Sequence, residues 1–563
     1  MKQKNTYILG AIAALLVVYL FSEKLFFRWD LTSEKRYSIS ENTKSLLKDL
    51  KGEYTIKLYL DGDLSAGFLQ LRKSAKEMAE EFSAYTDADI KVVFENPTQG
   101  ANDEERDKHY GELERRGLTV MREEEDKDEY GQTITRIVCP WAEISNGKRK
   151  KLVSLYQDNR DRSIDENLNN ASANLEYALT DAIRQLNKTK IDRILFTEGH
   201  GELPEILTYD VCENLRNYYQ IDRGDLRACY CPDSLFAYKA IIVAGPTQPF
   251  SEKDKYLIDQ YVMHGGKVMW LIDGVHISLD SLRTASETIG VGNNLNLEDQ
   301  LFRYGVRIEP VLVQDEQCSK LPVNTAPENE APKWKPKPWY YAPLLLTSPV
   351  HPISKNITPV KSEFASLIKA VGDDKDIRRD ILLVTSTSSR IQQMPSIVSM
   401  SIVNIDPREG YFNVGNAPIA VAMKGHFASN FSHRLKPEGI YSKTPQSNRS
   451  YETKMIVIAD ADIICNDVIP GSDGQPKIVP LGMDRYEGRQ YGNKEFIMNC
   501  INYLTDDEGW MQLRSRELQL RLLNKQASTI RKFWQIANVV LPLVVLALLG
   551  GGYYLARKRK YTK

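Results

Sequence analysis

The segment RILFTEGHGELPE at residues 193–205 carries the side chains best suited to chemistry in this sequence. Glu198, His200 and Glu202 follow an apolar run and are separated by single glycines. An imidazole between two carboxylates can transfer protons or bind a metal ion. The same residues suit a turn, because glycine adopts backbone angles closed to other residues and acids favour a helix start. No partner nucleophile is evident, so we expect a structural loop, with a ligand or domain contact as the alternative and catalysis as the least favoured interpretation.

A second group of candidate residues lies in a stretch rich in proline, lysine and aromatic residues. Residues 321–350 include APKWKPKPWYYAP, a composition that predicts an extended linker lying on the surface. Trp334, Trp339 and Tyr340 offer an aromatic contact to a sugar or a protein partner. Packing of the linker on its own domain is the favoured alternative, since connecting segments normally run over the surface.

Sequence signatures of common catalytic and cofactor sites are missing. HGGKVMW lacks the spacing of a P-loop, and no dinucleotide-binding glycine motif, zinc spacing or G-x-S-x-G elbow occurs. The seven cysteines form no C-x-x-C pair. Asp460 and Asp462 follow an apolar run, a pattern more typical of a turn than of a metal site. We therefore predict that the protein is not an enzyme and holds no cofactor or metal.

The loop at His200 belongs to a region of alternating elements. A capping box from Ser163 to Glu166 opens a helix, and apolar runs then alternate with helical periodicity. Nearly continuous apolar runs are typical of parallel strands covered on both faces. The expected strands contain RILFT, AIIVAG and KVMWLID, and the expected helices span residues 205–219 and 251–264. This order predicts an α/β fold with a doubly wound parallel sheet.

Residues 240–273, AIIVAGPTQPFSEKDKYLIDQYVMHGGKVMWLID, are similar to the class I glutamine amidotransferase-like fold. Active members of that superfamily keep a cysteine in a tight elbow flanked by glycines. None of the cysteines here has such flanks. The resemblance therefore implies a fold retained without its chemistry.

Uncharged segments near both ends predict membrane anchors. Residues 6–22 have the minimum length for a span, with a cleaved signal peptide as the rival interpretation. Residues 536–556 are flanked by cations and aromatics, as a transmembrane helix should be. Two spans would place both termini on one side and the intervening domains on the other, and the flanking charges do not decide which side.

These observations define a layout of the whole chain. Between the anchors we expect a small α/β domain, the doubly wound domain and a later α/β segment, followed by a stalk helix. The expected divisions are an anchor at 1–22, an N-terminal α/β domain at 30–160, the doubly wound domain at 163–320, the linker at 321–350, completion of the α/β region at 351–507, a stalk helix at 508–535, a transmembrane helix at 536–556 and a basic tail at 557–563.

The order of several blocks resembles the gliding-motility ABC transporter auxiliary family, the GldG family. The resembling blocks are RWDLTSEKRYSISENTKSLLKDL, TEGHGE, HPISKNITPVKSEFASLI, PIAVAMKGHFASNFSHR, DADIICND and YGNKEFIMNCINYL. The resemblance implies a non-catalytic subunit in a bacterial inner membrane with two spans and a large periplasmic domain. It also implies a multi-span ABC permease and a separate cytoplasmic ATPase as partners.

Two further expectations concern binding partners. The net charge of -1 gives no support for nucleic-acid binding. A periplasmic module that binds cell-wall glycan or peptide, through the aromatic segment or the His200 loop, is the alternative to the transporter subunit.

Overall fold

The computed structural model of the chain forms two units, Met1–Glu517 and Leu518–Lys563. The expected anchor at residues 1–22 lies outside the described residues. The described residues are 39–97, 103–125, 134–158, 162–187, 191–327, 330–372, 375–471, 474–515 and 528–561.

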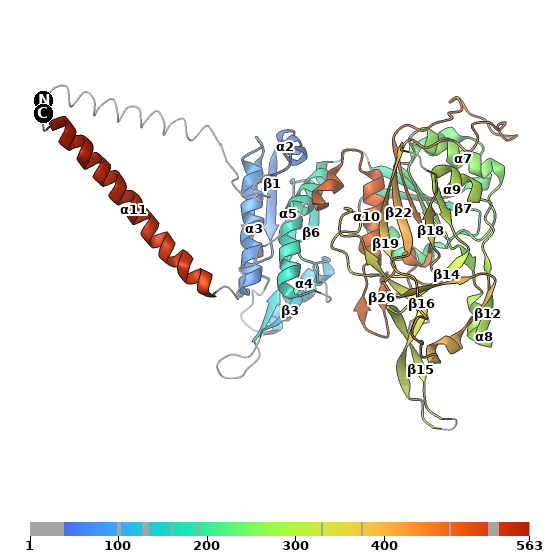
Figure 1. The fold of residues 1–563 in the computed structure, drawn as a ribbon. Helices are drawn as coiled ribbons and strands as arrows, with labels where there is room; N and C mark the ends of the chain where they lie inside the picture. The colour runs from blue at the N-terminus through green and yellow to red at the C-terminus, as the bar shows by residue number, and fades with distance from the viewer. Residues whose placement is uncertain are drawn as a thin grey trace. The chain divides into compact units, whose positions relative to one another are not determined.

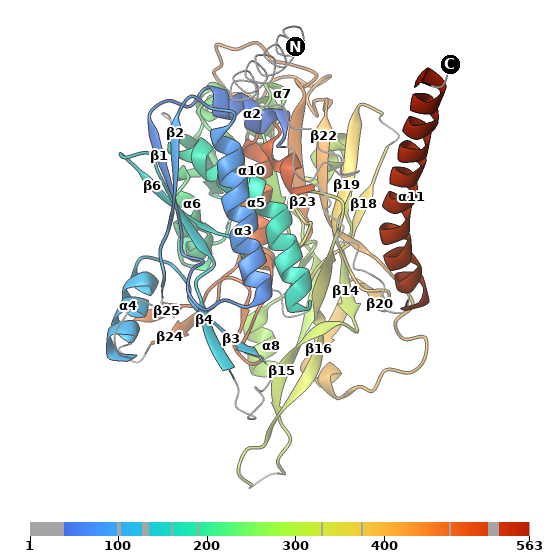
Figure 2. The same ribbon diagram turned by 90° about the vertical axis from the view of Figure 1, so that its left-hand side faces the viewer.

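The first part of the larger unit is a small α/β domain. Its helices α3 (Ala66–Ser83) and α5 (Ile164–Asn187) lie side by side and share one apolar core with the strands (Figure 2). In sheet order the strands are β2 (Asp89–Phe94), β1 (Glu53–Leu58), β5 (Trp141–Ser145) and β6 (Lys150–Ser154). The sequence predicted a small α/β domain over residues 30–160, but the helix that begins at the Ser163–Glu166 capping box was assigned to the doubly wound domain. Both reciprocal hydrogen bonds of that capping box form, and the helix packs in the core of the small domain.

The described residues of this domain also form two further helices and a two-stranded ribbon. Helix α2 (Glu41–Lys48) begins at the Ser40 cap, whose side chain accepts a hydrogen bond from the Thr43 amide. The charged stretch after residue 100 forms α4 (Asp103–Arg115) and a ribbon of β3 (Met121–Glu125) with β4 (Ile134–Val138). The charged sequence of β3, MREEE, lacks the apolar alternation that predicts a strand.

The second part of the larger unit contains a ten-stranded mixed sheet (Figure 1). In spatial order its main strands are β15 (Cys318–Asn324), β16 (Trp334–Thr347), β19 (Ile377–Val384), β22 (Pro418–Gly425), β23 (Thr453–Ile458), β10 (Val268–Leu271), β9 (Ala240–Ala244), β7 (Asp192–Glu198) and β8 (Tyr219–Asp225), and β17 (Val360–Lys361) pairs with β16. Strands β23, β10, β9, β7 and β8 are parallel, and the others extend the sheet in antiparallel fashion. The α/β class is thus confirmed, but the sheet is mixed.

Helices cover both faces of the parallel half. Helices α6 (Tyr209–Arg216) and α10 (Asn493–Thr505) pack on one face, and α7 (Glu252–Met263) and α9 (Glu298–Tyr304) pack on the other. Strand β9 shows why its sequence is apolar throughout: Ile242 enters the first core and Ile241 the second.

Short ribbons and one helix complete this part of the chain. They form α8 (Leu279–Ala285), the sheet β11 (Val275–His276), β12 (Glu287–Gly292) and β21 (Ser396–Ser399), and the pairs β13 (Val306–Ile308) with β18 (Ile368–Ala370), β14 (Val311–Asp315) with β20 (Ser389–Gln393), β24 (Val468–Pro470) with β25 (Pro476–Ile478), and β26 (Met483–Asp484) with β27 (Arg489–Gln490).

The expectation of a surface linker at 321–350 is wrong. Residues 334–347 are a strand of the large sheet, and the outer half of that strand pairs with β15 in a ribbon. The proline- and lysine-rich portion lies in the exposed outer half, whereas WYYA enters the core. The average composition of residues 321–350 therefore did not distinguish the exposed outer half of this strand from its buried inner half.

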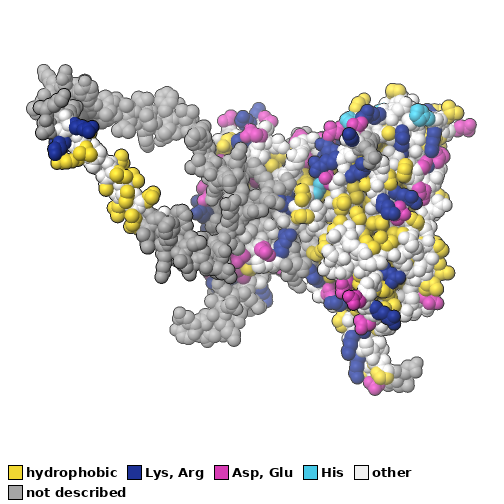
Figure 3. Space-filling view, viewed as in Figure 1, with side chains coloured by type: hydrophobic (Ala, Val, Ile, Leu, Met, Phe, Trp, Pro, Cys, Tyr) yellow, Lys and Arg dark blue, Asp and Glu magenta, His cyan; other side chains and the backbone are white. Residues whose placement is uncertain are grey.

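The C-terminal region also departs from the stalk helix expected at residues 508–535. Residues Trp510–Ser515 form the 3-10 helix η6, and Trp510, Met511 and Arg514 are buried in the larger unit. Helix α11 spans Ser528–Tyr561 as part of the separate second unit. One stretch of it, Asn538–Arg559, is long and apolar enough to cross a membrane, and its apolar side chains are exposed (Figure 3).

Candidate functional site

The strand order creates a switch point between β7 and β9. The chain runs from β7 outward to β8 and then returns past β7 to β9, giving the order 2-1-3-4-5 with β23 as the fifth strand. Connections leave in opposite directions at this point, and ligands of doubly wound sheets usually bind in the resulting crevice. The loop of His200 follows β7, so it lies where a ligand would be expected.

In this protein the crevice is filled by the chain itself. The carbonyl oxygen of His200 accepts hydrogen bonds from the amides of Thr247 (2.9 Å) and Gln248 (2.8 Å), which follow β9. The amide of Leu203 donates to the Ala244 carbonyl at 2.9 Å. Gly201 has φ +73°, and a Cβ there would lie 2.1 Å from the Thr247 hydroxyl oxygen. The glycine therefore permits the close approach that seals the two loops together.

The imidazole of His200 is held between two carboxylates. Its Nδ1 lies 3.3 Å from Glu202 Oε1, and its Nε2 lies 3.1 Å from Asp254 Oδ2. The ring stacks on Phe250 with centroids 3.8 Å apart, and only 1% of His200 is exposed. Asp254 also closes the capping box of α7 with Ser251, so this clamp ties the loop to the helix.

The charge state of the clamp opposes catalysis. Burial disfavours the charged imidazole, but hydrogen bonds to Asp254 and Glu202 outweigh burial and raise the pKa of His200 to about 9. Burial likewise opposes ionisation of both acids, yet the contact with His200 lowers the pKa of each carboxyl group. A protonated, enclosed imidazole cannot accept a proton at neutral pH. The clamp is suited to fixing the two loops.

Glu198, the third acid predicted with this loop, points elsewhere. Its carboxylate pairs with Arg223 at 2.6 Å, and 47% of the Glu198 side chain is exposed. The structure thus brings together His200 and Glu202 and separates Glu198 from them. Asp254 is the clamp residue that the sequence pattern did not reveal.

The predicted aromatic contact residues are also divided. Trp339 and Tyr340 are 2% and 5% exposed, and the Trp339 indole N–H donates to Glu363 at 3.2 Å. These two rings belong to a core cluster and are not accessible to a ligand. Only Trp334, on the outer part of the ribbon, is open to solvent at 65%.

The acids after β10 and β23 form a turn. Asp460 accepts hydrogen bonds from the amides of Asp462 (2.7 Å) and Glu363 (3.0 Å), and Asp273 accepts one from Ala461 (2.7 Å). Burial and mutual repulsion raise the pKa values of Asp460 and Asp462, and burial raises that of Asp273 to about 6. Within the described ranges, no group of three His, Cys, Asp or Glu residues is arranged to hold a metal.

The cysteines nearest the parallel sheet are not activated. Burial raises the pKa values of Cys212, Cys465 and Cys500, which keeps their thiols protonated. Thiolate chemistry requires the opposite shift. This agrees with the missing glycine-flanked elbow.

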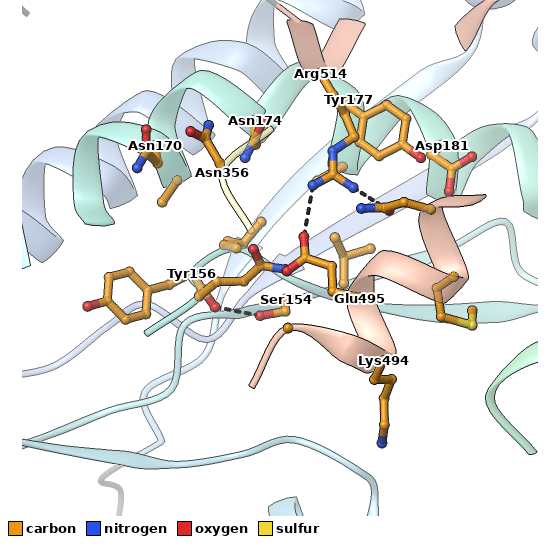
Figure 4. Close-up of a pocket in the computed structure, with 18 of the residues that line it drawn as sticks. Ser154, Tyr156, Asn170, Asn174, Tyr177, Asp181, Asn356, Lys494, Glu495 and Arg514 are labelled. Atoms are coloured by element: carbon orange, nitrogen blue, oxygen red, sulfur yellow. Dashed lines mark hydrogen bonds and ion pairs between the residues drawn. The ribbon is translucent and has the colours of Figure 1, made fainter. Parts of the chain in front are cut away.

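A separate cleft was not anticipated from the sequence. It has a volume of about 690 Å³ and lies between α5 on one side and α10 with η6 on the other, all within the larger unit (Figure 4). Asn170, Asn174, Tyr177 and Asp181 line it from α5 at three- and four-residue steps. The sequence contains this polar stripe of α5. The opposite wall of the cleft is formed by α10, which begins more than 300 residues after the end of α5.

Several charged side chains in the cleft are paired with neighbours. Arg514 is only 7% exposed; its guanidinium pairs with Glu495 at 2.8 Å and donates to Asn499 (Figure 4). Lys494 pairs with Asp210 at 2.8 Å. The cleft therefore presents neutral polar groups together with Lys151, Asp158 and Arg162.

Comparison with known proteins gives two family matches. Residues 192–500 match the family described as an ABC-type uncharacterized transport system, and residues 33–145 match a domain of unknown function. A search of curated proteins found no match. Among solved structures, the mmIFT52 N-terminal domain is 14% identical, with 56% of this chain and 99% of that chain covered and a TM-score of 0.32. A similarity at that level carries no functional argument.

Proposed function

Because the chain belongs to the family of ABC-type uncharacterized transport systems, we propose that it is a non-catalytic auxiliary subunit of an inner-membrane ABC complex of the gliding-motility type. The family match over residues 192–500 carries this proposal, since it covers nearly the whole of the large sheet and its helices. The domain would act as a scaffold or force-transmitting arm for the complex.

The site geometry supports a role without catalysis. The crevice at the switch point is sealed by hydrogen bonds between the loops that follow β7 and β9, and the imidazole there is charged and enclosed. A scaffold benefits from this arrangement, because a sealed crevice makes the sheet and its loops one rigid body. We also propose that the fold is derived from the glutamine amidotransferase-like fold. The crevice would then be a former ligand site that is now closed.

The proposed partners are a multi-span ABC permease and a separate ATPase on the cytoplasmic side. The chain has no P-loop, so ATP hydrolysis must come from another subunit. Helix α11 is the proposed permease contact. A Cβ added at Gly550, Gly551 or Gly552 would meet no described atom within 4 Å, and such small residues allow a second helix to approach closely.

We place the larger unit in the periplasm and both termini in the cytoplasm, with residues 1–22 as the first span and α11 as the second. A fusion of alkaline phosphatase after residue 300 should be active, and a green fluorescent protein fused to residue 563 should fluoresce. Fluorescence of a fusion at residue 300 would contradict this orientation.

Affinity purification tests the complex. The tagged full chain is extracted from membranes of its own bacterium in a mild detergent, and co-purifying proteins are quantified by mass spectrometry. A permease and an ATPase should be enriched together with the chain. A variant whose α11 is replaced by an unrelated single-span helix is the control, and it should stay in the membrane but lose both partners. Recovery of the wild-type chain alone would refute the proposal.

A further inference from the structure

The cleft between α5 and α10 contains a row of amide groups that the protein leaves free. Asn170 and Asn174 lie one helical turn apart on α5 and line the cleft. In the part of the chain that the structure describes, neither side chain forms a hydrogen bond to another residue. The buried carbonyl oxygen of Gln185, farther along the same wall, is also unpartnered among the described residues. The amide nitrogen of Gln185 already donates to Asp181, whereas the amides of Asn170 and Asn174 can both donate and accept hydrogen bonds.

Several of the charged groups around these amides are already engaged. Arg514 pairs with Glu495, and Lys494 pairs with Asp210. The ammonium group of Lys151 lies 3.4 Å from the centroid of the Tyr218 ring, and burial lowers the pKa of this lysine to about 8. Arg162, which also lines the cleft, donates to the Asn356 side chain at 3.4 Å. A charged ligand would have to compete with the pairs of Arg514 and Lys494, whereas a neutral ligand would leave them intact.

Aromatic rings supply the apolar part of the cleft. Tyr156, Tyr177, Tyr218 and Tyr491 line it, and rings of this kind can bury the apolar faces of a ligand. The hydroxyl groups of Tyr177 and Tyr491 already donate to Met511 and Glu487. The volume of about 690 Å³ falls within the range of small-ligand sites. It is large enough for a few linked sugar rings.

We propose that this cleft binds a short neutral saccharide. Free amides that donate and accept match the hydroxyl groups of a sugar, and tyrosine rings match its C–H faces. Glycan or peptide binding through the aromatic segment or the His200 loop was the alternative function expected from the sequence. The present proposal names a saccharide as the ligand and moves the site to the cleft, because Trp339, Tyr340 and His200 are buried in other parts of the protein. It does not depend on the proposed transporter role, because a subunit that lacks ABC partners would retain the cleft.

Isothermal titration calorimetry tests the proposal on the full chain in an amine-oxide detergent, whose head group contains no sugar. The probes are cellotetraose, maltotetraose and the tetramer of N-acetylglucosamine, with tetra-alanine as a neutral peptide. At least one saccharide should bind with a Kd of about 1 mM or tighter. The double variant Asn170→Ala/Asn174→Ala should weaken that binding about tenfold or more, because two hydrogen bonds are lost.

A matched control lies on the same helix. Asn169 is partly exposed but does not line the cleft, so Asn169→Ala should leave the Kd unchanged. Ala178→Trp is a second variant, which fills the cleft without removing a polar group and should abolish binding. Circular dichroism shows whether each variant folds. Failure of all three saccharides to bind at about 10 mM, tighter binding of tetra-alanine, or equal affinity in the cleft variants would overturn the proposal.

Discussion

The charged clamp at His200 predicts that the larger unit loses stability as pH rises. The pKa of this imidazole is raised from its ordinary value of 6.5 to about 9 in the folded protein. The folded state therefore binds more protons than the unfolded state between these values. The contribution of the His200 imidazole is fully present below about pH 6.5 and is lost as pH rises through about pH 9. The difference corresponds to about 3 kcal/mol, at about 1.4 kcal/mol per pKa unit.

Urea unfolding of the full chain in detergent, followed by tryptophan fluorescence, measures this effect. Trp270 is a suitable reporter because its ring packs edge-on against Phe250, the residue that stacks on His200. The urea concentration at the unfolding midpoint should decrease as pH is raised from about 6 to about 10. His200→Gln, which keeps polar groups without the titratable charge, should lower stability at about pH 6 by about 2–3 kcal/mol and flatten the pH dependence.

The control is His264→Gln, which removes an imidazole that bonds to the Gln260 carbonyl rather than to a carboxylate. This variant should keep the wild-type pH dependence. If His200→Gln and wild type lost stability in parallel across the pH range, the clamp would not be the cause and our account of the sealed crevice would fail.

Three further predictions concern packing, and each includes its own comparison. Gly201→Ala should lower the unfolding free energy by more than about 2 kcal/mol, because the added Cβ would lie 2.1 Å from the Thr247 hydroxyl oxygen. The control Gly474→Ala, at φ +77° with no other described atom within 4 Å of the added Cβ, should lower it by about 1 kcal/mol. Equal losses in thermal denaturation would contradict this. Trp339→Ala should cost about 3–5 kcal/mol and the exposed Trp334→Ala less than about 0.5 kcal/mol, so similar urea midpoints would exclude the assigned burial. Cys500 should resist thiol reagents until the protein unfolds, and rapid labelling of the native protein would disprove its enclosure.

Local sequence signals predicted the elements around the candidate site. The apolar runs predicted β7, β9 and β10, and the expected helix at residues 251–264 corresponds to α7. Such signals depend on neighbours within one turn or one strand, so a single sequence contains them. They also placed His200 at the end of a strand, where the structure has it.

The roles of His200, Trp339 and the cleft residues depend on contacts with residues far away in the sequence. The clamp needs Asp254, 54 positions from His200, and no local pattern connects the two. Trp339 is enclosed by core residues from distant parts of the chain, including Leu312, Phe364 and Val398, so its proline-rich sequence neighbours gave the wrong impression. The cleft requires α5 to face α10, a pairing set by tertiary structure rather than by either helix alone.

Photo-cross-linking from α11 in living cells tests the auxiliary-subunit role most directly. A photoreactive amino acid is introduced at successive exposed positions, including Leu546 and Leu548, and adducts are identified by mass spectrometry. Our account predicts adducts with a multi-span ABC permease that recur on one face of the helix, at three- and four-residue intervals. Adducts with lipid alone, or with unrelated membrane proteins at every position, would contradict it.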